Sequence, residues 1–494
     1  MAVILLALYG CGGGASGGEQ SIVESAVDLT GATLRVNNAS GSDLADGINE
    51  PYKSLQYALD QLRPGDLLVI EDSGQPYSSS AVIGEERDIN NALVRTLRGY
   101  RVSVSGTKNA PIIIEGRGIN RPQIDQMQSN STPNDATVGL LLECVSHIVI
   151  RNLEIYSANE AAITTATDGS CETENIVIEG NHIHNIYGEK YVGGVRMMGV
   201  SDAVIRDNHI HDVFSNESAE DKLLIKNGGG IENIVVENNH FERLDAGVLI
   251  NAQGLGDSTF ALAVEEAATA IQIKNNSFDT VGHAINLTTH ISDATSADEQ
   301  KTGLIKAVDI VGNTFAQIGS ALIVSAGDSE NQSYDICVYN NSTIDATASV
   351  LDISGVAGFE LFNNIFVLPQ SEILITRTPA NNTLLNNIAY SDNNLFYDFL
   401  SLRWRLDVNG AAETVYPDLP NWQVAAHPEL VTSPDLLAII ADPQFIDRFN
   451  SDYSVELDSP ANDVGRFGLT IGADFQLPWP VDMPDYPCAE RVLN

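Results

Sequence analysis

A short self-similar segment recurs through the middle of the 494-residue chain. Each copy is a run of β-branched residues with alternating polarity that closes on an asparagine. The clearest copies read His147-IVIRNLEI, Asn175-IVIEGNHI, Asp202-AVIRDNHI and Asn233-IVVENNHF. Repeats of strand-like units at intervals of roughly 20–40 residues indicate a solenoid, and helical solenoids would show a 3.6-residue periodicity that this segment lacks. The repeat therefore predicts a parallel β-helix.

The closing asparagines are predicted to stack in a column inside the rod. Their amides would then hydrogen-bond from coil to coil and satisfy the backbone of the turns. The positions are Asn152, Asn181, Asn208, Asn239, Asn276, Asn313, Asn341, Asn364 and Asn387.

A second strand precedes each of these segments by about 10 residues, and together these strands predict one parallel sheet along the rod. They are Gly139-LLLEC, Ala162-ITTAT, Gly194-VRMMG, Leu223-LIKNG, Gly247-VLINA, Ala284-INLTT, Ala321-LIVSA, Val350-LDISG and Ile373-LITRT.

Both ends of the repeat resemble those of parallel β-helix proteins that act on polysaccharides. The stretch 36–77 resembles their opening, with an amphipathic helix over Ser54 to Leu62 that covers the first coil, and 442–473 resembles their closing coil. The resemblance implies an all-β fold, a right-handed parallel β-helix (solenoid) over 21–475, with an N-terminal capping helix and an irregular C-terminal cap. Residues 476–494 would form a C-terminal tail.

The first 20 residues resemble a bacterial lipoprotein signal followed by a glycine-rich tether. An apolar run ends at Leu8-Tyr9-Gly10-Cys11, although the usual basic residues before the run are missing. Acylation of Cys11 would make the chain an exported lipoprotein, at the cell surface or in the periplasm, that meets the membrane through its lipid anchor only. The alternative is an ordinary secretory segment.

The chain is strongly acidic, with 26 Lys+Arg against 66 Asp+Glu and a formal net charge of −40. Such a surface repels nucleic acid, so we expect no nucleic-acid partner and expect a monomer. A polyanionic ligand would need a local basic patch or a bridging cation. Four cysteines remain after Cys11. Cys144 and Cys171 lie one coil apart and are predicted to form a disulfide, which leaves Cys337 and Cys488.

The working face of such rods is expected, from the resemblance, on the sheet of second strands. Two long insertions, 252–268 and 289–306, leave adjacent strands of this sheet. Period 2 predicts that Arg196, Leu224, Leu249, Asn286 and Asp352 point outward, and that the next outward row holds Glu143, Met198, Lys226, Asn251 and Thr288. Asn251, Asn286 and Asp352 are the predicted substrate-binding residues.

The segment 217–242 resembles the catalytic coil of the chondroitinase B and alginate lyase family. That resemblance implies Lys226 as the base of a β-elimination on a uronic acid polysaccharide and Ca²⁺ bound at Asp221 with Glu220 beside it. The second acidic position and the arginine of the family fall on Ala219 and Ala252. Arg196 or calcium would lower the pKa of Lys226, and His290 would protonate the leaving oxygen.

Other chemistries have weaker support. A hydrolase needs two carboxylates at ~5–9.5 Å, but Asp352 is alone in its column and Glu143 is several coils away. The pairs His182/His184 and His209/His211 flank inward Ile183 and Ile210, so their imidazoles should face solvent, and no metal role is expected. Trp404, Trp422 and Trp479 are expected to pack in the C-terminal cap. The rival to an enzyme is a non-catalytic rod: an adhesin, a scaffold or a glycan-binding protein.

Overall fold

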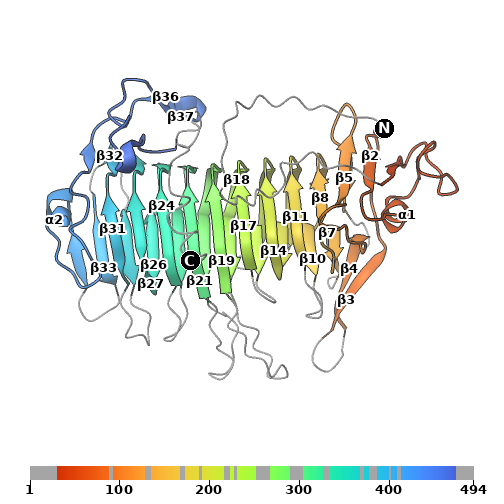
Figure 1. Cartoon of the computed structure of the whole chain (residues 1–494), viewed down its shortest axis with the longest axis horizontal. Helices are drawn as coiled ribbons and strands as arrows, with labels where there is room; N and C mark the ends of the chain where they lie inside the picture. Colours follow the sequence, from red (N-terminus) through yellow and green to blue (C-terminus); the bar gives the residue numbers. More distant parts are fainter. Residues whose placement is uncertain are drawn as a thin grey trace.

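The computed structural model of the chain describes residues 31–87, 93–127, 135–166, 173–188, 192–215, 223–226, 231–251, 267–289, 304–325, 333–367, 372–377, 386–399, 402–408 and 413–473. It is a rod of stacked parallel coils (Figure 1). The strands lie side by side across the long axis and follow one another along it. The predicted right-handed parallel β-helix is confirmed.

One face of the rod is a parallel sheet, here called the back sheet, whose strands are the repeated segments. Its order along the axis is β1 (Thr33–Val36), β2 (Leu67–Glu71), β5 (Ile112–Arg117), β8 (Ile148–Arg151), β11 (Thr173–Glu179), β14 (Val200–Arg206), β17 (Ile231–Glu237), β19 (Ala267–Lys274), β21 (Leu304–Val311), β24 (Ser333–Tyr339), β28 (Phe359–Phe362) and β31 (Ile388–Asp392), with β27 (Val356–Ala357) beside β24.

A second face, the histidine sheet, follows the asparagine turn of each coil. It contains β6 (Gln123–Asp125), β9 (Glu154–Tyr156), β12 (His182–Gly188), β15 (His209–Ser215), the first halves of β18 (His240–Asn251) and β20 (Ser277–Thr288), β22 (Thr314–Ala316), β25 (Ser342–Ile344), β29 (Ile365–Val367), β32 (Leu395–Tyr397) and β35 (Ile439–Ile440).

The third face, the site sheet, contains all nine predicted second strands. It comprises β4 (Leu93–Val102), β7 (Asp135–Glu143), β10 (Ala161–Ala166), β13 (Gly193–Met198), β16 (Leu223–Lys226), the second halves of β18 and β20, β23 (Ser320–Ser325), β26 (Leu351–Ser354), β30 (Leu374–Arg377) and β33 (Trp404–Val408). The alternation of apolar and polar residues along these strands had indicated them, because one side of each strand faces the core.

The core between the three faces is filled by aligned apolar side chains, one from each coil. Phe241, Phe278 and Phe315 stack with ring centroids 4.8 and 5.2 Å apart. Stacking of this kind ties each coil to its neighbours, as expected of a solenoid.

The predicted asparagine column is confirmed, with two corrections at its ends. Each member donates from Nδ2 to the Oδ1 of the next and is at most 2% exposed, from Asn181 through Asn208, Asn239, Asn276, Asn313, Asn341 and Asn364 to Asn394. Asn152 lies one residue too early, at a turn with φ 58°, and Leu153 occupies its coil's place in the column. Asn387 is also outside the column, because Asn394 closes that coil.

The N-terminal end of the rod carries the predicted helix, which is shorter than expected. Helix α1 (Leu55–Asp60) buries Leu55, Ala58 and Leu59 against β1, β2 and β4. Its apolar residues belong to the same core cluster as the coils. Next to it, β3 (Val82–Arg87) pairs antiparallel with β4.

The C-terminal end holds two stacked tryptophans. The ring centroids of Trp404 of β33 and Trp422 of α2 (Leu419–Gln423) are 5.2 Å apart, and both side chains are fully buried. Trp422 Nε1 donates to Asp435, whose burial raises the pKa of its carboxyl to about 6. Strand β34 (Thr414–Tyr416) pairs antiparallel with β33. The two described tryptophans therefore pack as predicted, and Trp479 lies outside the described residues.

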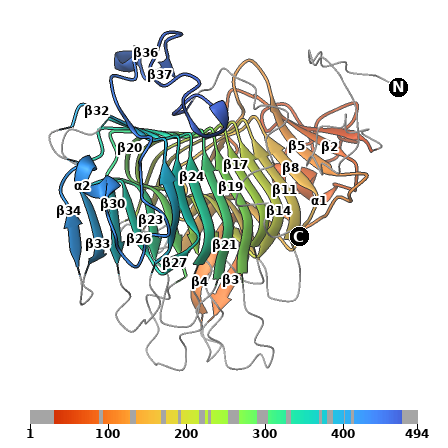
Figure 2. The same cartoon turned by 60° about the vertical axis from the view of Figure 1, so that its left-hand side comes forward.

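The segment 442–473 does not form the closing coil that we predicted. It contains β36 (Phe445–Asp447), β37 (Asp452–Val455) and the short 3₁₀ helices Arg448–Asn450 and Arg466–Gly468, and its two strands pair with each other. It packs against the asparagine turns from outside, where Asn340 Nδ2 donates to the Thr470 carbonyl at 2.6 Å and Gly472 donates to the Asn363 carbonyl. These side contacts place it over the flank of the rod (Figure 2).

Two cysteines can be followed in the structure. Cys144 and Cys337 are described, whereas Cys171 and Cys488 lie outside the described residues. The pairing of Cys144 with Cys171 therefore stays a prediction. Among the described residues, no helix has the length and apolarity needed to cross a membrane.

Candidate functional site

The outer side of the site sheet carries the residues that the sequence singled out. Strand register aligns one position from each coil, so that Arg196, Leu224, Leu249 and Asn286 follow one another, with Ile323 and Asp352 next. The second row runs through Met198, Lys226, Asn251, Thr288, Ser325, Ser354 and Arg377. Both predicted rows are confirmed in register.

The second row, which we call the polar row, holds short polar side chains at successive coils. Thr288, Ser325 and Ser354 are each partly exposed and lie at the ~4.8 Å spacing of neighbouring strands. Lys226 and Asn251 continue the row at backbone level, and their side chains lie outside the described part. The row therefore forms a regular line of hydrogen-bonding groups parallel to the rod axis.

Arg196 lies in the first outward row and is engaged by a carboxylate. It is 8% exposed and forms a short ion pair with Glu160, which is 2% exposed. A buried guanidinium that already pairs with a buried carboxylate is held in place by the cost of leaving either charge alone. The side chain of Lys226 lies outside the described part, so the role of Arg196 toward Lys226 stays a prediction.

Asn286 and Asp352 lie in the first outward row, in different surroundings. The Asn286 Oδ1 atom is buried and has no hydrogen-bond partner among the described residues, between Leu249 and Ile323 of the adjacent strands. Asp352 accepts two bonds from Arg377, at 2.7 Å from Nε to Oδ1 and 2.7 Å from Nη2 to Oδ2. The Arg377 side chain is 40% exposed and the Asp352 side chain 17%.

Asp352 and Glu143, the two carboxylates considered for hydrolysis, do not form a pair with each other. Asp352 is held by Arg377, and Glu143 pairs with Arg101 at 3.2 Å at the other end of the sheet. A glycosidase needs two carboxylates that flank one bond. Within the described ranges, this face therefore gives no support to glycoside hydrolysis by these two residues.

Several predicted site residues cannot be placed. His290, Asp221, Glu220 and Cys11 lie outside the described residues, as do 252–266 and 290–303 of the two long insertions. The described chain does show where the insertions begin, since β18 ends at Asn251 and β20 ends at Thr288. Both insertions thus leave from the polar row itself.

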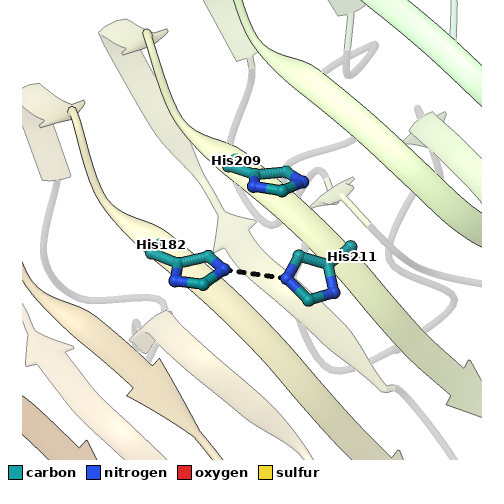
Figure 3. Close-up of side chains that lie close together, drawn as sticks. All are labelled: His182, His209 and His211. Carbon is teal, nitrogen blue, oxygen red and sulfur yellow. Dashed lines mark hydrogen bonds between the residues drawn. The ribbon is translucent and has the colours of Figure 1, made fainter.

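Among the described residues, the groups that could hold a metal ion lie on a different face. Groups of histidines and carboxylates come together on the histidine sheet, around His182, His209 and His211 (Figure 3). We had expected these imidazoles to face solvent and to have no role in binding a metal. The missed signal was the spacing, because His-x-His after the asparagine in two successive coils places four imidazoles side by side.

Comparison with known proteins supports the fold. The family described as right-handed β-helix region matches residues 119–300. Among solved structures, the chain is similar to a pectate lyase (12% identity, covering 93% of this chain and 97% of that one, TM-score 0.47). It is also similar to a family 28 exopolygalacturonase of Yersinia enterocolitica (10% identity, 83% and 78% covered, TM-score 0.45).

A lacto-N-biosidase of Eubacterium ramulus is a further structure to which the chain is similar (15% identity, TM-score 0.41), with 74% of this chain covered and only 64% of that one. No curated protein matches the sequence.

Proposed function

We propose that this protein binds or cleaves a polysaccharide that lies along the polar row of the site sheet. The observation that carries the proposal is the row itself, with Thr288, Ser325 and Ser354 in register on successive coils. A glycan chain presents hydroxyl groups at regular intervals, and hydroxyl side chains can both donate to them and accept from them. The two long insertions start from the same row, as loops around a solenoid's binding face do.

The specific chemistry that we propose is β-elimination from a uronic acid. Lys226 takes the proton from the carbon next to the carboxylate. The electrons form a carbon–carbon double bond as the glycosidic C–O bond breaks, and the leaving oxygen receives a proton from His290. With Arg196 engaged by Glu160, the charge that stabilises the substrate carboxylate would come from Ca²⁺ at Asp221 and Glu220.

The same proposal places the protein outside the cell, anchored by lipid on Cys11. Its net charge of −40 is compatible with such a location, because the ionic strength there screens surface repulsion. The anchor and the calcium ion both rest on the sequence alone.

The rival is a non-catalytic rod that holds glycans. One observation favours it: the only charged groups described in the rows near Lys226 are already paired, Arg196 with Glu160 and Asp352 with Arg377. Such a surface offers hydrogen bonds to a neutral glycan more readily than charge to a polyanion.

Blocking the row tests both versions. Ser325→Trp should weaken polysaccharide binding by about tenfold or more, because the indole would cover the line of hydroxyl groups. The measurement is retardation in gels that contain a panel of uronate and neutral polysaccharides. Ser201→Trp, on β14 of the back sheet, is the matched control and should leave retardation unchanged. Equal retardation of Ser325→Trp and wild type would move the site away from the polar row.

A further inference from the structure

Five imidazoles form a regular array on the outside of the histidine sheet. Register places His182 beside His209 and His209 beside His240, while His184 lies beside His211. On each strand, the residue after the first histidine points inward and is fully buried. These residues are Ile183, Ile210 and Phe241. The strand alternation therefore forces these histidines onto one surface, one strand spacing apart.

The centre of this array brings three imidazoles around one point. His182 Nε2 lies 2.8 Å from His211 Nε2, so the edges of the two rings point at each other, with His209 beside both (Figure 3). One ligand atom from each of the three lies within 4.8 Å of the others. Two nitrogens bound to one zinc ion would be ~3.3 Å apart, from bonds of ~2.0–2.1 Å in tetrahedral geometry. The three nitrogens are therefore close enough together to be considered as one ligand set.

A carboxylate orients the central histidine. Asp212 Oδ2 lies 2.6 Å from His211 Nδ1. Arg243 Nη2 donates to the same Asp212 oxygen at 2.7 Å. An imidazole that donates from Nδ1 to a carboxylate keeps its Nε2 lone pair free, which is the usual arrangement behind metal-bound histidines. Here that free nitrogen is the one that points at His182.

The electrostatics also favour a cation. Glu154 Oε1 lies 3.1 Å from His184 Nε2, and Glu242 Oε2 lies 3.3 Å from His209 Nε2. Carboxylates therefore lie at both ends of the array. With Asp212 they outnumber the two nearby guanidinium groups, Arg243, which already pairs with Asp212 and Glu242, and Arg121, whose charge acts on His182.

We propose that His182, His209 and His211 bind one divalent first-row transition metal ion, of which Zn²⁺ is the representative, with Asp212 positioning His211. Three histidines leave one coordination position open for water or another ligand, and imidazole ligands select such metals over calcium. The site is independent of the polysaccharide proposal, because it lies on a different face of the rod.

The test is zinc binding by the full chain after treatment with a chelator, measured by titration calorimetry with Zn²⁺ alone. We expect one ion per chain, and with Co²⁺ in its place the visible absorption of a tetrahedral site. His182→Ala and His211→Ala should each abolish most of the uptake. His427→Ala, a partly buried histidine far along the chain in the C-terminal region, is the matched control and should bind like wild type.

Asp212→Asn keeps the test decisive if a histidine variant fails to fold. Asp212 has φ 53°, a conformation that asparagine adopts readily, so this variant should keep its circular dichroism. It should bind zinc about 10- to 100-fold more weakly than wild type. No zinc uptake by the wild type, or an affinity unchanged by Asp212→Asn and by the folded histidine variants, would overturn the proposal and leave the array as stacked structural rings.

Discussion

Replacing Asn239 with alanine should lower the free energy of unfolding by about 3 kcal/mol or more. Asn239 Nδ2 donates to the Ile205 carbonyl at 2.8 Å and to Asn276 Oδ1 at 3.0 Å, while its Oδ1 accepts from the Asn208 backbone N–H at 3.0 Å. All of these groups are buried, so truncation leaves donors and acceptors without partners in a place that water cannot reach. The loss is read from the midpoint of denaturant-induced unfolding.

Glu232→Ala provides the matched control, since Glu232 is exposed on strand β17 a few residues before Asn239. It should change the free energy of unfolding by no more than about 0.5 kcal/mol. If Asn239→Ala and Glu232→Ala had the same free energy of unfolding, the asparagine column would not contribute to the stability of the fold.

Lys226→Ala should reduce the turnover of a uronate polysaccharide by about 100- to 10,000-fold, the usual contribution of a general base. The variant should unfold at the same denaturant concentration as wild type within error, as expected for an outward position of a strand. Its backbone pairs with that of Met198 and Asn251, which places it in the polar row one coil before the first of the two long insertions.

Lys108→Ala serves as the matched control for the loss of one positive charge, because Lys108 is an exposed lysine in a turn outside the site sheet. It should keep full activity. Activity of Lys226→Ala equal to that of Lys108→Ala would remove Lys226 from the mechanism and leave the binding function of the row to be judged by the Ser325 variant.

The fold could be predicted from the repeat because each coil obeys the same simple constraints. Alternating polarity identified nine site-sheet strands, all but β4 and β33 at the two ends of the sheet, and the buried asparagines marked the turn between the back sheet and the histidine sheet. The two errors, Asn152 and Asn387, lie in the end coils of the column. In the first of these coils Leu153 takes the column position and in the last Asn394 takes it, as the hydrogen bonds to Asn181 and from Asn364 show.

The site was harder to predict, for physical reasons that differ from residue to residue. The alternation of the strand placed Arg196 on the outer face correctly. No local pattern predicts that the Arg196 guanidinium forms a buried ion pair with Glu160, which lies 36 residues earlier in the chain. The contacts within the histidine array were not predicted because each His-x-His pair was considered alone. The contacts that matter lie between coils, such as the one from His182 to His211, 29 residues apart.

The segment 442–473 shows the same limit at the end of the rod. Its apolar residues include Tyr453 and Ile471, which pack on Ile365 and Leu395 at the flank of the coils. A closing coil would bury the same kinds of residue, so composition alone does not separate the two arrangements. Their difference lies in which strand edges are paired.

The proposed chemistry is tested most directly by the ultraviolet absorbance of wild-type protein incubated with a panel of uronic acid polysaccharides, with and without added calcium. Each β-elimination creates one carbon–carbon double bond conjugated to a carboxylate, so turnover produces absorbance that hydrolysis does not. The account predicts a steady rise with at least one polymer, which Lys226→Ala removes. A flat trace with every polymer, in both the presence and the absence of calcium, would contradict it.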